Sequence, residues 1–136
     1  MNKKYVLDSS AIMAFLEEEA GADTVEELLE QSQIKQITVY VSFVTFTEIF
    51  YISIQEQGER IASERLKRIE SMPICRRESN PELTKLAGEM KAKYRISLAD
   101  TFIAALAKME DAILVHKDPE FESMENQIEM LILSYK

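Results

Sequence analysis

Apolar residues are spaced along the chain in two ways, which together predict an alternation of strands and helices. Short β-branched or aromatic runs predict strands, and longer stretches with a helical apolar period predict helices. The predicted strands are 5–7, 37–41, a short one entered through 73–75, 112–115 and 130–133. The predicted helices are 11–16, 23–33, 44–57, 59–71, 81–94 and 98–109. This alternation predicts an α/β fold with a parallel sheet covered by helices on both faces.

Polar residues and glycines mark the expected ends of the helices. Ser9 or Ser10 is expected to cap the first helix, and Gly21 is expected to end it. Asn80, which is followed by a proline, predicts the start of the fifth helix. Ser97 is expected to cap the sixth.

Length and composition limit the possible classes of protein. The 136 residues suit one domain, which we expect to span 1–136. A single cysteine and a single histidine exclude an intramolecular disulfide and make a histidine-rich metal site improbable. The chain has no signal-peptide pattern and no apolar stretch that approaches the ~20 residues of a membrane span. We therefore expect a cytoplasmic protein without a membrane segment.

The charge is distributed unevenly. A net charge of −8 argues against a nucleic-acid partner. Residues 59–95, however, hold ten of the sixteen Lys and Arg residues against six acids, a local charge of +4. Two interpretations fit this stretch: a set of solvated helix faces, or a basic rim beside an acidic pocket.

Four acids stand in unusually apolar surroundings. Asp8 directly follows the first strand, and Asp118 lies just past the strand that ends at Val115. Ligands bind at the carboxyl ends of parallel strands, so both acids are expected at one edge of the sheet. Glu48 and Asp100 lie in helices that are apolar on nearly every side and contain no nearby Lys or Arg. Because buried carboxylates need a partner, a divalent cation is a plausible ligand for the four.

Each acid also has a purely structural interpretation as a helix cap. The candidate caps are Asp8, Asp118 before Pro119, and the capping-box pairs Ser97–Asp100 and Thr45–Glu48. One such acid alone is more simply explained by capping. Four in one small chain, two of them at one sheet edge, favour a functional site, and an acid at a helix N-terminus can serve both purposes.

The acids lie in four motifs that together resemble a known family. The motifs are 5–11 around Asp8, 47–49 around Glu48, 97–105 around Asp100 and 114–121 around Asp118. In order, spacing and context they resemble the PIN domain family, and especially the short toxins of the VapC type. The resemblance covers essentially the whole chain.

The resemblance implies a three-layer sandwich with a parallel sheet of four or five strands. It implies a ribonuclease that depends on Mg²⁺ or Mn²⁺, is usually a homodimer, and is blocked by a VapB-like antitoxin lying across its cleft. Carried over by position, Asp8, Glu48, Asp100 and Asp118 are the catalytic and metal-binding residues. One position differs: the family usually has Thr or Ser two residues before the last acid, and this chain has His116. His116 is either a contact to the metal or substrate, or a partly exposed residue at a strand end.

The chemistry that these residues favour is hydrolysis of RNA by a metal-activated water. Ser9, Ser10 and Ser97 lack a histidine base in the same motif, so a covalent nucleophile is not indicated. An aspartyl phosphatase would need a second Asp where Ser10 stands.

Two other functions within the same family stay open. One is a housekeeping RNA-processing PIN nuclease, and the other is a catalytically inactive PIN module that binds protein. The apolar residues Phe43, Phe46, Phe50, Tyr51 and Ile54 exceed what one inward helix face needs. They fit either a dimer surface or ordinary core packing.

Overall fold

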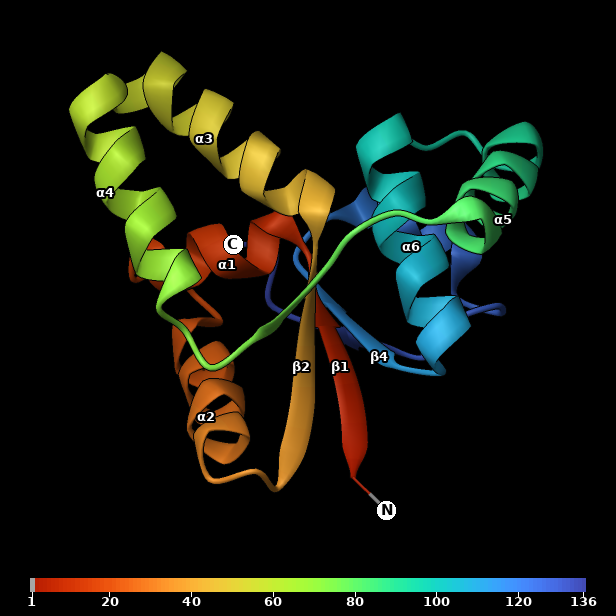
Figure 1. The fold of residues 1–136 in the computed structure, drawn as a ribbon, viewed down its shortest axis with the longest axis horizontal. Helices are drawn as coiled ribbons and strands as arrows, with labels where there is room; N and C mark the ends of the chain where they lie inside the picture. The colour runs from red at the N-terminus through yellow and green to blue at the C-terminus, as the bar shows by residue number, and fades with distance from the viewer. Residues whose placement is uncertain (1) are drawn as a thin grey trace.

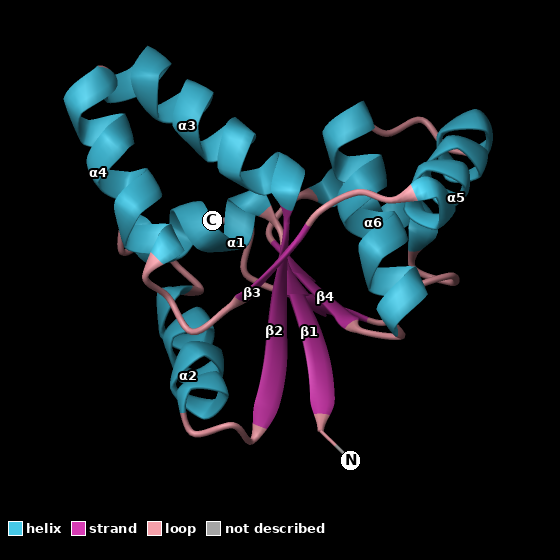
Figure 2. Ribbon diagram, in the orientation of Figure 1, coloured by secondary structure: helices cyan, strands magenta, loops and turns pink. Residues whose placement is uncertain are grey.

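A five-stranded parallel sheet forms the middle layer of the structure, a computed structural model that describes residues 2–136 (Figures 1 and 2). The strands are β1 (Lys3–Leu7), β2 (Ile37–Ser42), β3 (Cys75–Arg77), β4 (Ile113–His116) and β5 (Met130–Ile132). Their order across the sheet is β3-β2-β1-β4-β5, and every pair is parallel. The chain thus adds β2 and β3 on one side of β1 and then β4 and β5 on the other side. The carboxyl ends of β1 and β4 flank this reversal, which is where open α/β sheets bind ligands.

Helices cover both faces of the sheet, which confirms the predicted three-layer α/β sandwich (Figure 2). The helices are α1 (Ser9–Leu16), α2 (Ala22–Gln33), α3 (Phe43–Gln57), α4 (Glu59–Glu70), α5 (Pro81–Lys93), α6 (Leu98–Glu110) and the 3₁₀ helix η1 (Pro119–Met124).

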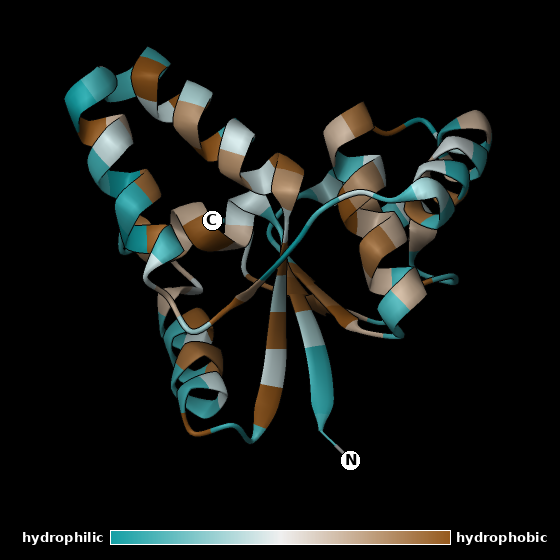
Figure 3. Ribbon diagram, viewed as in Figure 1, coloured by the Kyte–Doolittle hydropathy of each residue, from teal (hydrophilic) through white to brown (hydrophobic). Residues whose placement is uncertain are grey.

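Alternation along the central strands creates two cores. Val6 and Leu114 pack with α5, α6 and η1, whereas their neighbours Leu7 and Val115 pack with α1, α2 and α3. All four side chains are fully buried. Figure 3 shows the hydrophobic colour along β2 and β4 and over much of α6, while the start of β1 and most of α4 are hydrophilic. Among residues 2–136, no helix combines the length and apolar character that crossing a membrane requires.

The start of α1 decides between the candidate caps Asp8, Ser9 and Ser10. Asp8 is the N-cap, and its Oδ1 accepts the Ala11 N–H at 2.8 Å, so the predicted caps Ser9 and Ser10 are wrong and both lie inside the helix. The helix ends at Leu16, and Gly21 is instead the residue that precedes α2. Gly21 has a φ of 99°, and a Cβ there would approach the Leu133 side chain to 3.0 Å. Glycine is required at this position by both backbone and packing.

The starts of α3, α5 and α6 test the remaining predicted caps. Asn80 and Ser97 cap α5 and α6 as predicted, each with its side chain accepting a backbone N–H. Helix α3 begins at Phe43 with Ser42 as its cap. Glu48 therefore lies in the second turn of α3, so the capping-box interpretation of Glu48 is wrong, and its carboxylate needs another explanation.

Candidate metal centre

The carboxyl ends of β1 and β4 open into a pocket of about 280 Å³ that contains all four predicted acids. Its walls come from the first turns of α1 and α6, one side of α3, and the start of η1. The lining residues are Asp8, Ser9, Ser10, Met13, Glu48, Ile52, Ser97, Asp100, Asp118 and Glu120. Among the residues that the structure describes, this lining contains neither Lys nor Arg. The pocket therefore concentrates negative charge without an internal counter-charge.

Asp8 lines the pocket from the end of β1 and is only 2% exposed. Its carboxylate accepts the Ala11 N–H and the Ser10 hydroxyl, each at 2.8 Å, so the cap of α1 and the pocket acid are one side chain. Burial raises the pKa of Asp8 to about 7, although these hydrogen bonds favour the charged form and Asp118 opposes it. The capping interpretation of Asp8 is therefore confirmed, and the same carboxylate also lines the pocket.

Asp100 lines the same pocket from the first turn of α6 and is 7% exposed. Burial, followed by the charges of Asp118, Glu120, Glu48 and Asp8, raises the pKa of Asp100 to about 8. Carboxylates that repel one another in this way keep bound protons near neutral pH unless a cation replaces those protons.

Glu48 reaches the pocket from α3 and is held by α1. The Ser9 hydroxyl donates to Glu48 Oε1 at 2.5 Å, which links two elements separated by 39 positions in the sequence. Ser9, expected only as a helix cap, instead orients one of the predicted site residues.

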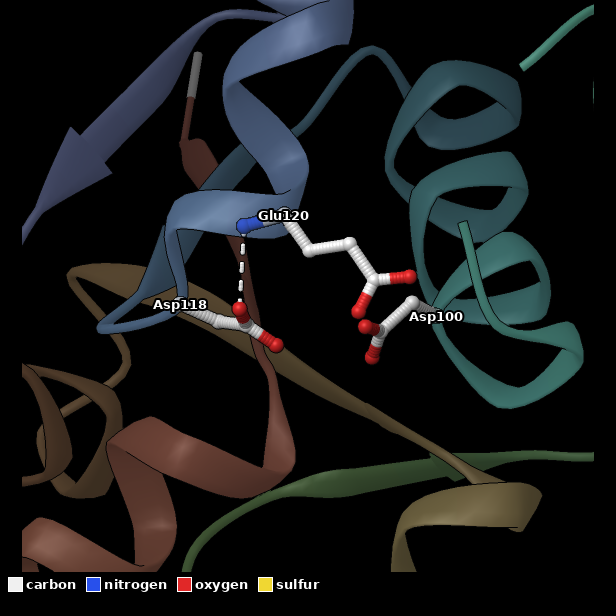
Figure 4. A group of neighbouring side chains, drawn as sticks. All are labelled: Asp100, Asp118 and Glu120. Atoms are coloured by element: carbon white, nitrogen blue, oxygen red, sulfur yellow. Dashed lines mark hydrogen bonds between the residues drawn. The ribbon is translucent and has the colours of Figure 1, made fainter. Parts of the chain in front are cut away.

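Glu120 is a fifth acid of the pocket, and sequence reasoning did not include it. Asp100, Asp118 and Glu120 each offer a carboxylate oxygen, and these oxygens lie within 4.8 Å of one another (Figure 4). Asp8 and Glu48 line the same pocket but are not part of this closest group. The signal for Glu120 in the sequence was the order Asp-Pro-Glu. When Asp118 caps η1 and Pro119 is its first residue, the Asp118 side chain accepts the Glu120 N–H, which keeps Glu120 close to Asp118.

The donor set of this pocket fits a hard divalent cation. Every charged group in the lining is a carboxylate, and Mg²⁺ and Mn²⁺ prefer oxygen ligands. Burial and mutual repulsion make the ionised carboxylates costly without a cation, as the raised pKa values of Asp8 and Asp100 indicate. Asp100, Asp118 and Glu120 are close enough to share one ion, with Asp8 and Glu48 beside them.

His116 supports the pocket from behind. It is fully buried at the end of β4, does not line the pocket, and packs on Phe121 with ring centroids 5.0 Å apart. Its Nδ1 accepts the Asp118 N–H at 3.1 Å, and burial lowers the pKa of the imidazole. The expectation of a partly exposed residue was wrong, and neither does His116 reach the pocket as a ligand. It is a neutral group that fixes the backbone of Asp118.

The basic stretch lies on the outer sides of the two walls. Helix α4 packs on α3, and α5 packs on α6, so the basic helices stand outside the pocket on opposite sides (Figure 1). Some of the charge is used internally: Arg76 pairs with Glu78, and Arg77 pairs with Glu110. Within residues 2–136, several exposed side chains of the stretch have no ion pair or hydrogen bond, namely Lys67, Lys85, Lys93 and Arg95.

The family model of the PIN domain matches residues 5–127. The chain belongs to the PIN domain family. The match spans all four acidic motifs, so the resemblance seen in the sequence is confirmed at the level of the family. A search of curated protein sequences gives no significant match.

Solved structures with the same fold include chains of VapBC toxin–antitoxin complexes. One is VapBC2 of Rickettsia felis bound to a DNA fragment from its promoter: TM-score 0.76, 19% identity, covering 96% of this chain and 99% of that chain. DNA-bound VapBC of Salmonella typhimurium gives a TM-score of 0.76 at 16% identity, covering 97% and 98%. VapC20 of Mycobacterium tuberculosis, a sarcin–ricin loop cleaving toxin, gives 0.69 at 18% identity, covering 88% and 93%. At these identities the comparison establishes the PIN fold of this chain.

The position of His116 in a PIN domain suggests a direct test. Its Nδ1 accepts the N–H two residues ahead, a bond that a Thr or Ser hydroxyl also makes in a tight turn. We expect His116→Thr to retain Mn²⁺ affinity and His116→Leu to lose about 10-fold or more, because only Leu leaves the Asp118 N–H without an acceptor. Isothermal titration calorimetry with Mn²⁺ measures this difference. Thr is expected to lower the free energy of unfolding by about 2–4 kcal/mol through the cavity beside Phe121. Equal Mn²⁺ affinities of the two variants would show that His116 does not fix Asp118.

Proposed function

We propose that this PIN domain is a metal-dependent endoribonuclease and the toxin of a VapBC-type toxin–antitoxin pair. The observation that carries the proposal is the pocket at the carboxyl ends of β1 and β4, where Asp8, Glu48, Asp100 and Asp118 meet without a basic residue in the lining. Bound Mg²⁺ or Mn²⁺ would supply an activated water and would stabilise the charge that develops on the phosphate.

Each pocket residue has a proposed role that follows from its position. Asp8 and Asp100, the two most buried acids of the pocket, would be the principal metal ligands. Asp118, at the start of η1, and Glu48, on α3, would complete the site from two sides. Ser9 holds Glu48 and Ser10 holds Asp8, so neither serine is needed as a nucleophile. Glu48 is well situated to orient the attacking water, because its Oε1 is fixed by Ser9.

The flanking basic helices support RNA as the substrate. A metal ion makes an acidic pocket able to accept a phosphate, and exposed Lys and Arg can then hold the neighbouring phosphates. Arg95 is exposed in the loop before α6, two residues from Ser97 in the pocket lining. Lys67 on α4 and Lys93 on α5 extend the same charge along the two outer sides.

A VapB-like antitoxin and a second copy of the chain are the proposed protein partners. The chains with the same fold from Rickettsia felis and Salmonella typhimurium come from VapBC complexes, which supports an antitoxin for this chain as well. The apolar residues of α3 are divided between core and surface: Phe46 is buried, whereas Tyr51 and Ile54 are 47% and 38% exposed. These two exposed residues support a homodimer contact on α3.

Metal removal tests the proposed activity most directly. We expect the purified protein to cut total RNA in Mn²⁺ or Mg²⁺, to lose this activity in EDTA, and to regain it when Mn²⁺ is added in excess, because the carboxylates alone offer no nucleophile. Gel analysis and sequencing of RNA ends would measure cleavage and locate the target. Unchanged cleavage in EDTA would contradict the proposed mechanism, and Mn²⁺ binding without any cleavage would favour an inactive PIN module.

A further inference from the structure

The first turn of α6 contains half of a capping box. In a complete box the cap side chain accepts the N–H of the third helical residue, and the carboxylate of that residue accepts the N–H of the cap. The first half is present, because Ser97 Oγ accepts the Asp100 N–H at 3.1 Å. The second hydrogen bond of the box is not made by Asp100. The Ser97 N–H instead donates to Glu120 Oε1 at 2.5 Å.

This replacement matters because Asp100 cannot do both tasks. A short acidic side chain that folds back onto the N–H of its own cap turns away from any ligand in front of the helix. In the structure the Asp100 carboxylate instead lies in the pocket, where its oxygen is within 4.8 Å of those of Asp118 and Glu120 (Figure 4). The Ser97 N–H, three residues before Asp100, could therefore draw the Asp100 carboxylate out of the pocket. Glu120 prevents this because it already accepts the hydrogen bond from that N–H.

Glu120 is itself held in place by the neighbouring acid. Its N–H donates to Asp118 Oδ1 at 2.9 Å, and Pro119 fixes the backbone between them. From there its side chain spans to Ser97, 23 positions earlier in the sequence. The hydrogen bond from a helix N–H to a carboxylate is charge-assisted and is favoured by the helix dipole. The loop after β4 and the start of α6 are thus joined through one side chain.

We propose that Glu120 is a positioning residue, which keeps the Asp100 carboxylate in the pocket by accepting the Ser97 N–H in its place. The inference rests on the proposed metal site and adds a residue to it that acts through Asp100. It differs from direct ligation by Glu120, because positioning needs only a hydrogen-bond acceptor, whereas ligation by a carboxylate also draws on its negative charge.

Glu120→Gln and Glu120→Ala separate these two roles. Gln retains an oxygen that can accept the Ser97 N–H and loses the charge, while Ala loses both. In crystal structures of the metal-free variants, we expect Asp100 to stay in the pocket with Gln and to close the capping box on the Ser97 N–H with Ala. By calorimetry, we expect Gln to bind Mn²⁺ within about threefold of the wild type and Ala to bind about 10–100-fold more weakly, the usual cost of losing an outer partner of a metal ligand.

Glu125→Ala is the matched control, because it removes an exposed acid just after η1 and outside the pocket lining. It is expected to leave both Mn²⁺ affinity and the Asp100 position unchanged. An Asp100 carboxylate that stays in the pocket of the Ala variant would overturn the inference, as would equal losses of Mn²⁺ affinity in Gln and Ala. Because the crystallographic comparison is made without metal, it tests the positioning of Asp100 even if the protein proves not to cleave RNA.

Discussion

Asp100→Asn is expected to reduce metal-dependent RNA cleavage by at least about 100-fold, beyond the range for an outer partner of a metal ligand. Asp100 is buried, faces the other acids, and lies in the first turn of α6. Asn retains the size and the polarity of the side chain but offers a metal only a neutral oxygen. Initial rates of cleavage of a defined RNA in Mn²⁺, together with Mn²⁺ affinity from calorimetry, measure the effect.

Asp23→Asn provides the control for this substitution. Asp23 is an exposed acid in the first turn of α2, so the same chemical change is made in the first turn of a helix outside the pocket. We expect wild-type cleavage from this variant. Wild-type cleavage from Asp100→Asn would remove the basis for the proposed mechanism.

The equivalent experiment at Asp8 requires Asn rather than Ala. Asp8 caps α1 by accepting the Ala11 N–H, and loss of a cap costs about 0.5–2 kcal/mol. Asn caps a helix as well as Asp does, so Asp8→Asn removes the charge and leaves the cap. Asp8→Ala would mix a loss of stability with a loss of activity.

The metal-free protein is expected to become less stable as pH rises from about 5 to about 8, and Mn²⁺ is expected to reverse this loss. The pKa values of Asp8 and Asp100 rise from an ordinary 3.8 to about 7 and about 8 in the folded chain. Between the ordinary and the raised values, the folded protein therefore holds protons that the unfolded chain has released. Stability falls with pH wherever the folded state binds more protons, so this contribution is lost through the raised pKa values.

Thermal unfolding at a series of pH values, in EDTA and in excess Mn²⁺, tests this linkage. The stabilisation by Mn²⁺ is expected to grow with pH because protons compete for the same oxygens, and it reaches about 2.7 kcal/mol when free Mn²⁺ is 100 times the dissociation constant. His116 acts in the opposite direction, because burial lowers its pKa and stability then rises with pH near the ordinary value of 6.5.

The double variant Asp8→Asn, Asp100→Asn isolates the contribution of the two acids. The double variant retains His116. Subtracting its stability at each pH from that of the wild type therefore removes the contribution of the His116 imidazole. We expect the double variant to be more stable than the metal-free wild type at pH 8 and to gain little from Mn²⁺. A metal-free wild type that matches the variant at every pH would show that the two carboxyl groups titrate normally.

The alternation of elements was predictable because local spacing reports on burial. Val6 and Leu7 belong to the chain's first apolar run, 5–7, and each faces one of the two helical layers that the alternation predicted. The caps Asn80 and Ser97 were predictable for the same reason, since a cap bonds only to residues within its own first turn. The acids Asp8 and Asp118 were expected at one sheet edge because both follow strands of a parallel sheet.

Contacts between distant segments were decided only by the tertiary structure. Ser9 is a plausible cap by residue type, but in the fold its hydroxyl donates to Glu48, 39 positions later in the sequence. Glu120 reaches Ser97 only because η1 folds back beside α6, and no local pattern records that approach.

The period of buried positions and the chemistry of the residues are local properties, so they were enough to predict an α/β sandwich with Asp8, Glu48, Asp100 and Asp118 as candidate site residues. Only the folded chain shows that these acids share one pocket, that Glu120 joins them, and that His116 is buried outside the pocket lining. The physical reason is that hydrogen bonds and charge repulsion act across a few ångströms of space, and only the packed fold sets which side chains lie that close.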